Sequence, residues 1–372
     1  MQQVKFEVDE DKALVLANIN GALLELPALW LRERCQDDKH LDQITKQRLY
    51  DSHQLNEEIA LSGVKATEDG LLSLSFSDGY VGSYDTQVFN DDFDYSDGLP
   101  DVKSWKADTD KAQFKISHDL LSTPSGMLQA LECFLTYGVL IIDGVDQREG
   151  AVLEVAERFG YVRETNFGKS FSVYTRPNSD DLAYRSVALG PHTDNPYRNP
   201  IPGIQLLHCI QNETQGGLST LVDSLSVVSQ LKQEDPEGFD LLSRVPVRYR
   251  HLDKSICLSE RRTMIQLDIN GQVEGVAYSP RLDFLPLLKQ DDLIVFHRAR
   301  KRLGQLLSDP KFEWRFKLAP GQLQMFHNSR VLHGRTEFDP NEGLRYLQGA
   351  YIDLDGPKGR YKAQKKRQLS EG

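Results

Sequence analysis

The chain has 372 residues and a formal net charge of −11, an acidic balance that argues against a nucleic-acid-binding surface, for which a basic patch is expected. Its hydrophobic content of 39% and charged content of 27% are those of an ordinary globular protein, long enough for one large or two unequal domains. Its four cysteines are widely separated and include no C-x-x-C pair, so neither a disulfide framework nor a cysteine-rich zinc knuckle is indicated.

The N-terminal part of the chain reads as short strands separated by turns. Residues 13–19 lead to Asn20-Gly21, and the alternating residues 71–76 lead to Asp78-Gly79; both dipeptides are typical of tight hairpin turns. We therefore expect a small β-rich N-terminal domain over residues 1–100. Between residues 90 and 110 the chain is rich in Asp and lacks long apolar runs, which predicts an acidic, solvated linker, placed at residues 101–115.

A larger second domain is expected over residues 116–372. Apolar spacing predicts helices at 127–135 and 150–159, two helical pieces around Pro236 between 221 and 242, and a long helical segment at 284–307. Strands are predicted at 139–142, 263–268 and 273–278. Strands in two packed sheets with helices on one outer side make a double-stranded β-helix, or distorted jelly roll, so we predict a mainly β fold with flanking helices.

Three distant side chains form a candidate metal site in this domain. His192 and Asp194 lie two residues apart on an extended segment and project the same way, and His333 can complete one face of an octahedron. Two imidazoles and one carboxylate with open positions are the ligands of non-haem Fe(II) oxygenases. Arg345 follows closely after His333, and its planar guanidinium suits the distal carboxylate of a 2-oxo acid such as 2-oxoglutarate.

Several ordered motifs between residues 165 and 355 resemble those of the γ-butyrobetaine and trimethyllysine dioxygenases, a family within the taurine-dioxygenase-like Fe(II)/2-oxoglutarate oxygenases. The matching segments are 191–194 (PHTD), 202–209 (PGIQLLHC), 216–223 (GGLSTLVD), 332–335 (LHGR) and 349–351 (GAY). Residues 29–35 (LWLRERC) also resemble the small leading domain of that family, so the resemblance covers most of the chain.

The resemblance implies an enzyme that uses Fe(II), 2-oxoglutarate and dioxygen to hydroxylate an aliphatic carbon. His192, Asp194 and His333 would then be the catalytic metal ligands. Arg345 would pair with the distal carboxylate of 2-oxoglutarate, and Ser219 and Leu207 would complete its site. The protein's own contribution would be positioning, because the oxidant attacks whatever carbon lies nearest.

The resemblance also implies an aromatic cage for a trimethylammonium group. The matching positions are Phe167, Phe171, Tyr184 and Tyr351. Ring faces attract a quaternary cation that cannot donate hydrogen bonds, with roughly 0.5–2 kcal/mol for each contact. The expected substrate is therefore a small trimethylammonium zwitterion.

The anionic end of the substrate departs from the family pattern. Asp181 and Ser279 stand where two asparagines are expected, and Asn195 replaces a tyrosine. An ionised Asp181 would repel an anion unless it paired with Arg185 or Arg281. A phosphonate, with three oxygens and up to two negative charges, would make better use of Arg281 and a hydroxyl than a carboxylate would. We therefore favour 2-(trimethylamino)ethylphosphonate, the substrate of one branch of the family.

Other substrates and other functions stay open. γ-Butyrobetaine hydroxylation to carnitine is the nearest alternative, and a sulfonate or an amino acid would keep the enzyme class. A non-catalytic quaternary-amine binding module belongs to a different class of protein. Such a module would bind its ligand without consuming oxygen.

The leading domain of the relatives holds a structural zinc through cysteines and a histidine. Here Cys35 remains, whereas Asp37 and His40 stand where further cysteines are expected. Zinc bound by Cys35, His40 and His53 is the alternative to a domain held by packing alone, which we expect. The resemblance further implies a homodimer. The absence of a basic-then-apolar start and of an apolar run near ~18 residues predicts a cytoplasmic protein without a membrane partner.

Overall fold

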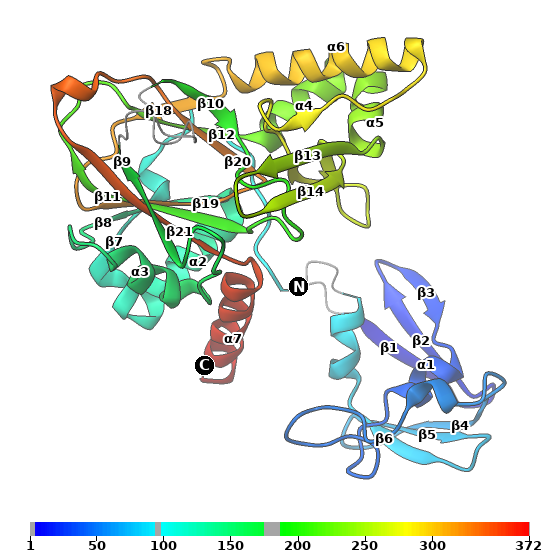
Figure 1. Ribbon diagram of the computed structural model, residues 1–372. Helices are drawn as coiled ribbons and strands as arrows, with labels where there is room; N and C mark the ends of the chain where they lie inside the picture. The colour runs from blue at the N-terminus through cyan, green and yellow to red at the C-terminus, as the bar shows by residue number, and fades with distance from the viewer. Residues whose placement is uncertain (1–3, 94–97, 175–186, 372) are drawn as a thin grey trace. The chain divides into compact units, whose positions relative to one another are not determined.

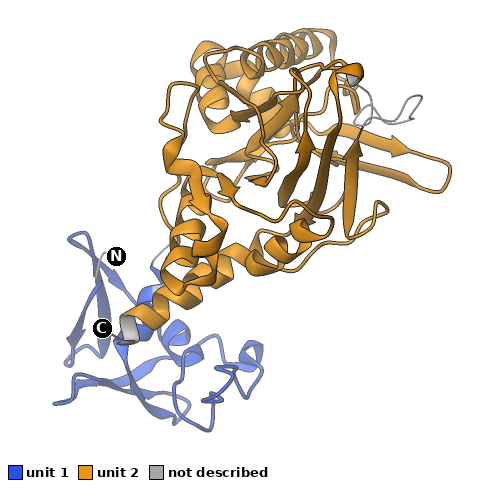
Figure 2. Ribbon diagram, turned by 90° about the vertical axis from the view of Figure 1, so that its left-hand side faces the viewer, with its two compact units in different colours: residues 1–98 blue, residues 99–372 orange. Residues whose placement is uncertain are grey.

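A computed structural model describes residues 4–93, 98–174 and 187–371 of the chain. Contacts divide the chain into two compact units, Met1–Gly98 and Leu99–Gly372 (Figure 2). Within the described residues, none of the helices combines the length and the hydrophobicity that crossing a lipid bilayer requires.

Unit 1 consists of two three-stranded antiparallel sheets and a short helix, which confirms the β-rich N-terminal domain. The strands are β1 (Lys5–Asp9), β2 (Leu14–Ile19), β3 (Ala22–Glu25), β4 (Leu61–Ala66), β5 (Leu72–Phe76) and β6 (Val81–Tyr84), and the helix is α1 (Ala28–Glu33). Both predicted hairpin turns form: Asn20 and Gly21 between β2 and β3, and Gly79 between β5 and β6, have positive φ. Those φ values are the reason for Asn and Gly at these positions.

Unit 2 is built on two facing sheets. The larger sheet has the order β7 (Lys115–Ser117), β8 (Val139–Asp143), β19 (Gln322–His327), β11 (Ile204–Asn212), β21 (Arg345–Ile352), β9 (Ser170–Tyr174). The smaller has the order β10 (Leu189–His192), β20 (Val331–Arg335), β12 (Ser219–Asp223), β18 (Glu313–Phe316). One buried cluster contains Leu207 of the larger sheet and Leu221 of the smaller, so it lies between the sheets. This arrangement confirms the predicted double-stranded β-helix.

Helices cover both outer faces of this pair of sheets (Figure 1). α2 (Pro124–Tyr137), α3 (Ala151–Phe159) and α7 (Asp355–Glu371) pack on the larger sheet, and α4 (Ser224–Glu234), α5 (Pro236–Arg244) and α6 (Gln290–Leu307) pack beside the smaller one. The prediction of helices on one outer side was therefore incomplete. The outward side chains of both sheets are apolar, for example Leu206 in β11 and Leu332 in β20, and both faces require cover.

Local boundaries also differ from the prediction in three places. Residues 221–223 belong to strand β12 rather than to a helix, and α6 begins at Gln290 rather than near residue 284. In the range expected to be a solvated linker, Trp105 is 2% exposed, and its backbone N–H donates to Asp223. An indole ring packs into apolar surroundings even when its neighbours in sequence are charged.

A small group of strands extends from unit 2 next to α5. It comprises β13 (Val247–Leu252), β14 (Cys257–Arg262) and β17 (Asp283–Phe284), with a separate hairpin of β15 (Ile265–Leu267) and β16 (Val273–Val276). The hairpin occupies the two strands predicted around Asn270-Gly271. β13 brings Arg250 and His251 to a cavity that also contains His192.

Candidate active site

The pairing of β10 with β20 brings the two predicted metal-binding histidines together. The antiparallel register sets His192 directly opposite His333, and the two ring centroids are 4.4 Å apart. Asp194 follows in the turn after β10, with Oδ1 3.1 Å from Nε2 of His192 and Oδ2 3.9 Å from Nε2 of His333. One ligand atom from each of the three residues lies within 4.8 Å of the others.

A buried asparagine holds the turn that carries Asp194. Asn328, which is fully buried, accepts a hydrogen bond from the backbone N–H of Asp194 and donates to its carbonyl and to that of Pro202, each at 2.9 Å. Asn195 adopts a left-handed φ of 53°, which asparagine tolerates better than most residues. The turn is therefore fixed from both sides, and the carboxylate points back toward the histidines.

Hydrogen bonds also set the orientation of the ligand atoms. Nδ1 of His192 donates to the carbonyl of Gly190 at 3.0 Å, which turns its Nε2 toward the Asp194 carboxylate. Tyr351 donates its hydroxyl to Oδ2 of Asp194 at 2.8 Å. Partners of this kind orient metal ligands.

Electrostatics favour the ligand forms of these side chains at neutral pH. Burial, reinforced by His192, lowers the pKa of His333 to about 3, so its imidazole is neutral. Burial raises the pKa of Asp194, but His333 and the hydrogen bonds from His192 and Tyr351 outweigh that effect and hold the pKa well below its usual range. Nε2 of both histidines faces this carboxylate, at 3.1 Å for His192 and 3.9 Å for His333, as the ligand atoms of one metal ion would. These N, N and O donors fit Fe(II).

Two cavities meet at this triad. The larger, of about 410 Å³, is lined by six predicted substrate residues: Phe167, Phe171, Asn195, Ser279, Arg281 and Tyr351. The smaller, of about 90 Å³, is lined by the predicted co-substrate residues Leu207, Ser219 and Arg345. His192 and Asp194 line both cavities. The predicted Tyr184 and Asp181, like Arg185, lie outside the described residues.

Arg345 is a buried cation in the smaller cavity. It is 7% exposed, and its Nε has no hydrogen-bond partner within the described residues. Burial lowers the pKa of Arg345 to about 10, so it stays protonated at neutral pH. A Cβ on Gly217 would lie 2.9 Å from that Nε, so the glycine makes room for the side chain. A buried guanidinium at the end of a cavity is suited to a carboxylate.

Several residues that sequence reasoning missed line these cavities or support the triad. The supporting residues are Asn328 and Gly190; the larger cavity adds Tyr197, Arg250 and His251, and the smaller adds Gln205, Gln324 and Arg335. Strand alternation was a usable signal for Gln205, because it lies two residues before Leu207 on one face of β11. Asn328 had no comparable signal, because its role depends on a turn that is remote in sequence.

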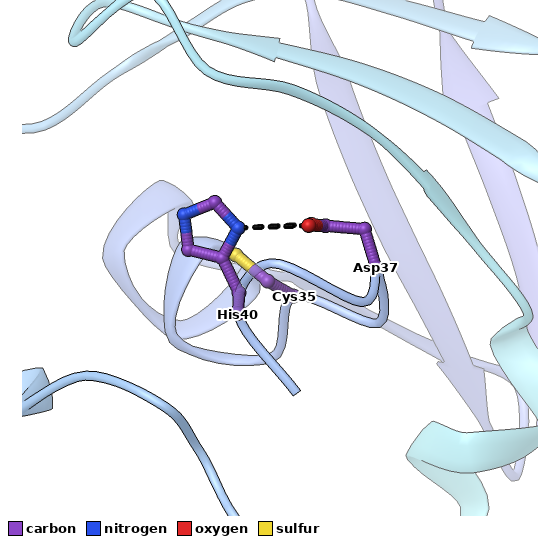
Figure 3. Close-up of side chains that lie close together, drawn as sticks. All are labelled: Cys35, Asp37 and His40. Carbon is purple, nitrogen blue, oxygen red and sulfur yellow. Dashed lines mark hydrogen bonds and ion pairs between the residues drawn. The ribbon is translucent and has the colours of Figure 1, made fainter. Parts of the chain in front are cut away.

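A second group of metal-capable side chains lies in unit 1. Cys35, Asp37 and His40 have ligand atoms within 4.8 Å of one another, and His40 contacts Asp37 directly (Figure 3). Arg32 donates to Sγ of Cys35 at 2.8 Å, and Tyr80 donates to Asp37. The predicted alternative with His53 does not form among the described residues, since His53 lies exposed in a separate turn, Ser52–Gln54.

The fold and the triad define a class, the non-haem Fe(II)- and 2-oxoglutarate-dependent dioxygenases. Residues 99–351 match the model of the taurine catabolism dioxygenase TauD, TfdA family, and the chain belongs to this family. When bound at these residues, Fe(II) would activate dioxygen for hydroxylation of a C–H bond, and 2-oxoglutarate would supply two electrons through its oxidative decarboxylation to succinate. Membership in a family of dioxygenases argues against the non-catalytic binding module.

The chain is similar over most of its length to dioxygenases of known substrate. It is 29% identical to the γ-butyrobetaine dioxygenase of Pseudomonas sp. (strain AK-1) over 342 residues, covering 90% of this chain and 89% of that one. It is 27% identical to the trimethyllysine dioxygenase of Meyerozyma guilliermondii over 369 residues, with the same two coverages of 90% and 89%. The human γ-butyrobetaine dioxygenase is 26% identical, with 88% of each chain covered.

A solved structure supports the fold. An asparagine oxygenase in complex with Fe(II), 3-hydroxyasparagine and succinate superposes with a TM-score of 0.50 at 14% identity. The superposition covers 64% of this chain and 93% of that one. At this identity the similarity shows the shared fold alone.

Proposed function

We propose that this dioxygenase hydroxylates an aliphatic carbon of a small trimethylammonium zwitterion. The observation that carries the proposal is an aromatic wall directly beside the candidate iron ligands. The rings of Phe171 and Tyr351 stack with centroids 5.1 Å apart, and Phe167 lines the same cavity. Such faces attract a quaternary ammonium group, which has no hydrogen to donate, by roughly 0.5–2 kcal/mol per contact. The named substrates of the relatives carry this group.

The roles of the residues follow from the cavity that each one lines. His192, Asp194 and His333 hold Fe(II), and Arg345, Ser219 and Leu207 bind 2-oxoglutarate in the smaller cavity. The larger cavity then receives the substrate, with its cationic group against the aromatic wall. Since both cavities open onto the same ligand atoms, the target carbon is held next to the iron.

The finer proposal concerns the anionic end of the substrate. Ser279, Arg281, Arg250 and His251 line the same larger cavity as the aromatic wall. Within the described residues, neither arginine forms an ion pair with a carboxylate. Two cationic side chains and a hydroxyl suit the dianionic phosphonate of 2-(trimethylamino)ethylphosphonate, whereas γ-butyrobetaine would offer them a single carboxylate.

A substrate panel tests both levels of the proposal. The purified protein is supplied with Fe(II) and 2-oxoglutarate, and succinate release is measured with γ-butyrobetaine, trimethyllysine, 2-(trimethylamino)ethylphosphonate and taurine. We expect stimulation only by trimethylammonium compounds, and the strongest by the phosphonate. Stimulation by taurine alone would overturn the proposal, and a preference for γ-butyrobetaine would overturn only the assignment of the anionic end.

Variants connect the activity to the proposed residues. We expect His192→Ala to abolish succinate release. We expect Phe171→Leu to raise the KM for the trimethylammonium substrate at least tenfold, because the ring face that attracts the cation is lost. Phe284→Leu is the matched control, since its ring is 45% exposed and lies outside both cavities.

A further inference from the structure

Two buried glutamines lack hydrogen-bond partners in the smaller cavity. Gln205 in β11 and Gln324 in β19 are each 2% exposed, and both line the cavity that contains Arg345. In the described part of the chain, neither side-chain amide forms a hydrogen bond, and each Oε1 is fully buried. A buried amide without partners is unfavourable in a folded protein, and such groups call for a ligand or an ordered water.

The register of the larger sheet locates both amides between the triad and Arg345. Gln205 pairs with Tyr351 on β21 and with Phe326 on β19. Tyr351 donates to Asp194, and the Phe326 ring lies 4.8 Å from that of His333, so Gln205 is at the metal end. Gln324 pairs with Leu207, and Leu207 pairs with Gly349 of β21. Gly349 lies two residues from Tyr351 in the direction of Arg345, so Gln324 is nearer than Gln205 to the arginine end of the cavity.

These positions match the polar groups of a dicarboxylic keto acid. Arg345 supplies a cation at one end of the cavity, and the triad supplies a metal site at the other. Between them, apolar side chains such as Leu207 and Leu347 leave the two amides as neutral polar groups on the cavity wall. Rotation of a glutamine amide by half a turn exchanges its NH₂ group and its carbonyl oxygen. The NH₂ groups of Gln205 and Gln324 can therefore each donate a hydrogen bond to an oxygen atom of a ligand.

We propose that Gln205 and Gln324 are co-substrate-binding residues whose amide N–H groups donate to oxygen atoms of 2-oxoglutarate. The proposal rests on the assignment of the smaller cavity to this co-substrate under the proposed function. It adds two binding groups between the metal site and Arg345, with Gln205 at the metal end. It also accounts for the presence of two polar side chains at buried positions of a sheet face.

The test uses single Gln205→Met and Gln324→Met variants, which keep the side-chain length and remove the amide. Binding of 2-oxoglutarate to the Fe(II)-loaded protein is measured by calorimetry under argon, without turnover. We expect the Kd to rise at least tenfold in each variant. We also expect the melting temperature of the metal-free variants to stay equal or to increase, because an unsatisfied buried amide has been removed.

Gln348→Met is the matched control. Gln348 is a buried glutamine of β21 whose Oε1 accepts a hydrogen bond from the Gly150 N–H at 2.7 Å. Its replacement is expected to lower the melting temperature and to leave the Kd for 2-oxoglutarate unchanged. The Kd for 2-oxoglutarate and the melting temperature therefore distinguish a ligand-binding glutamine, such as Gln205 or Gln324, from a structural one such as Gln348.

Two results would overturn the inference. A Kd within twofold of the wild type in both variants would mean that the amides bind only water, and a fall in melting temperature like that of Gln348→Met would assign them a structural role. Failure of the wild-type protein to bind 2-oxoglutarate is a different result. It would reject the assignment of the cavity, and with it the proposed function.

Discussion

At the scale of single residues, Tyr351 joins two parts of the site that the sequence treats separately. Its ring stacks on Phe171 in the aromatic wall, and its hydroxyl donates to Oδ2 of Asp194. The residue was predicted for the wall alone. We propose that the hydroxyl also positions the Asp194 carboxylate, so that one side chain lines the larger cavity and orients a candidate iron ligand.

Tyr351→Phe removes the hydroxyl and keeps the ring. We expect affinity for Fe(II) to fall on the order of 10- to 100-fold, because partners that orient metal ligands contribute on this scale. The KM for a trimethylammonium substrate is expected to change little at saturating iron. Anaerobic metal titration measures the first effect and steady-state kinetics the second.

Tyr346→Phe on the same strand is the control for this prediction. The Tyr346 hydroxyl contacts Ser172 and Glu149, and no metal ligand. Equal metal affinity in the two variants would contradict the role assigned to the Tyr351 hydroxyl.

At the scale of elements, the turn after β10 depends on a side chain from the loop between β19 and β20. Asn328 forms three hydrogen bonds to the backbone of this turn and of the segment that follows it. Asn328 itself is fully buried, so its loss would leave these backbone groups without their partner. The same loop therefore precedes one ligand strand, β20, and fixes the turn that follows the other, β10.

Asn328→Ala leaves the backbone N–H and carbonyl of Asp194 without their partner. We expect the unfolding free energy to fall by about 3 kcal/mol and the affinity for Fe(II) to fall with it. Denaturant unfolding and metal titration measure the two effects. Asn341→Ala, at an exposed turn, is the control, and equal stability of the two variants would refute the assignment.

In unit 1, the loop after α1 is held by hydrogen bonds to Asp37. Burial raises the pKa of Asp37, but the hydrogen bonds from Tyr80 and His40 have a larger, opposite effect, and the pKa is lowered to about 2. Since the folded pKa lies below the unfolded value near 3.8, this carboxylate stabilises the fold above that value. The stabilisation is lost as the pH falls from about 4 to about 2.

We expect Asp37→Asn to reduce this acid sensitivity. The unfolding free energy of the full chain is measured at pH 6 and pH 3 by denaturant titration. The difference between the two pH values is expected to be smaller in Asp37→Asn than in the wild type. Asp38→Asn removes the same charge from the exposed neighbouring residue and is expected to preserve the wild-type difference; identical behaviour of the two variants would contradict the prediction.

At the scale of the whole molecule, a buried ion pair connects the site to the beginning of unit 2. Arg330, directly before β20, is 3% exposed and lies 3.3 Å from Asp223 at the end of β12. It also donates to the carbonyls of Thr136 in α2 and Lys103. One guanidinium therefore links the smaller sheet, a helix on the larger sheet and the segment before β7.

Arg330→Met leaves the Asp223 carboxylate buried without its cation. We expect a loss of about 3–5 kcal/mol of unfolding free energy, as found when one partner of a buried pair is removed. Arg148→Met is the control, because Arg148 is half exposed in its pair with Glu154 and is expected to contribute at most about 1 kcal/mol. Denaturant unfolding compares the two, and similar losses would show that the burial of Arg330 is unimportant.

Local signals in the sequence were sufficient for the hairpins and for part of the site. Asn20-Gly21 specifies a turn because the backbone there needs positive φ, a requirement of neighbouring residues alone. His192 and Asp194 were recognisable because strand geometry directs alternate side chains to one side. His333 and Arg345 could be proposed from their chemistry and their motifs, and both line the smaller cavity.

The amino-acid order by itself determined which side chains are capable of binding iron, a keto acid and a quaternary cation, because side-chain chemistry and short-range backbone preferences are properties of the residues. Only the tertiary structure decided the register that sets His192 opposite His333 and the hydrogen bonds of Asn328 to the turn that carries Asp194. It also decided the contact of the Tyr351 hydroxyl with Asp194 and the burial of the Gln205 and Gln324 amides without hydrogen-bond partners. Each of these depends on segments remote in the chain meeting where water is excluded. Where distant segments pack together, the packing sets the hydrogen-bond partners and the burial of each side chain. A local sequence pattern contains no information about either.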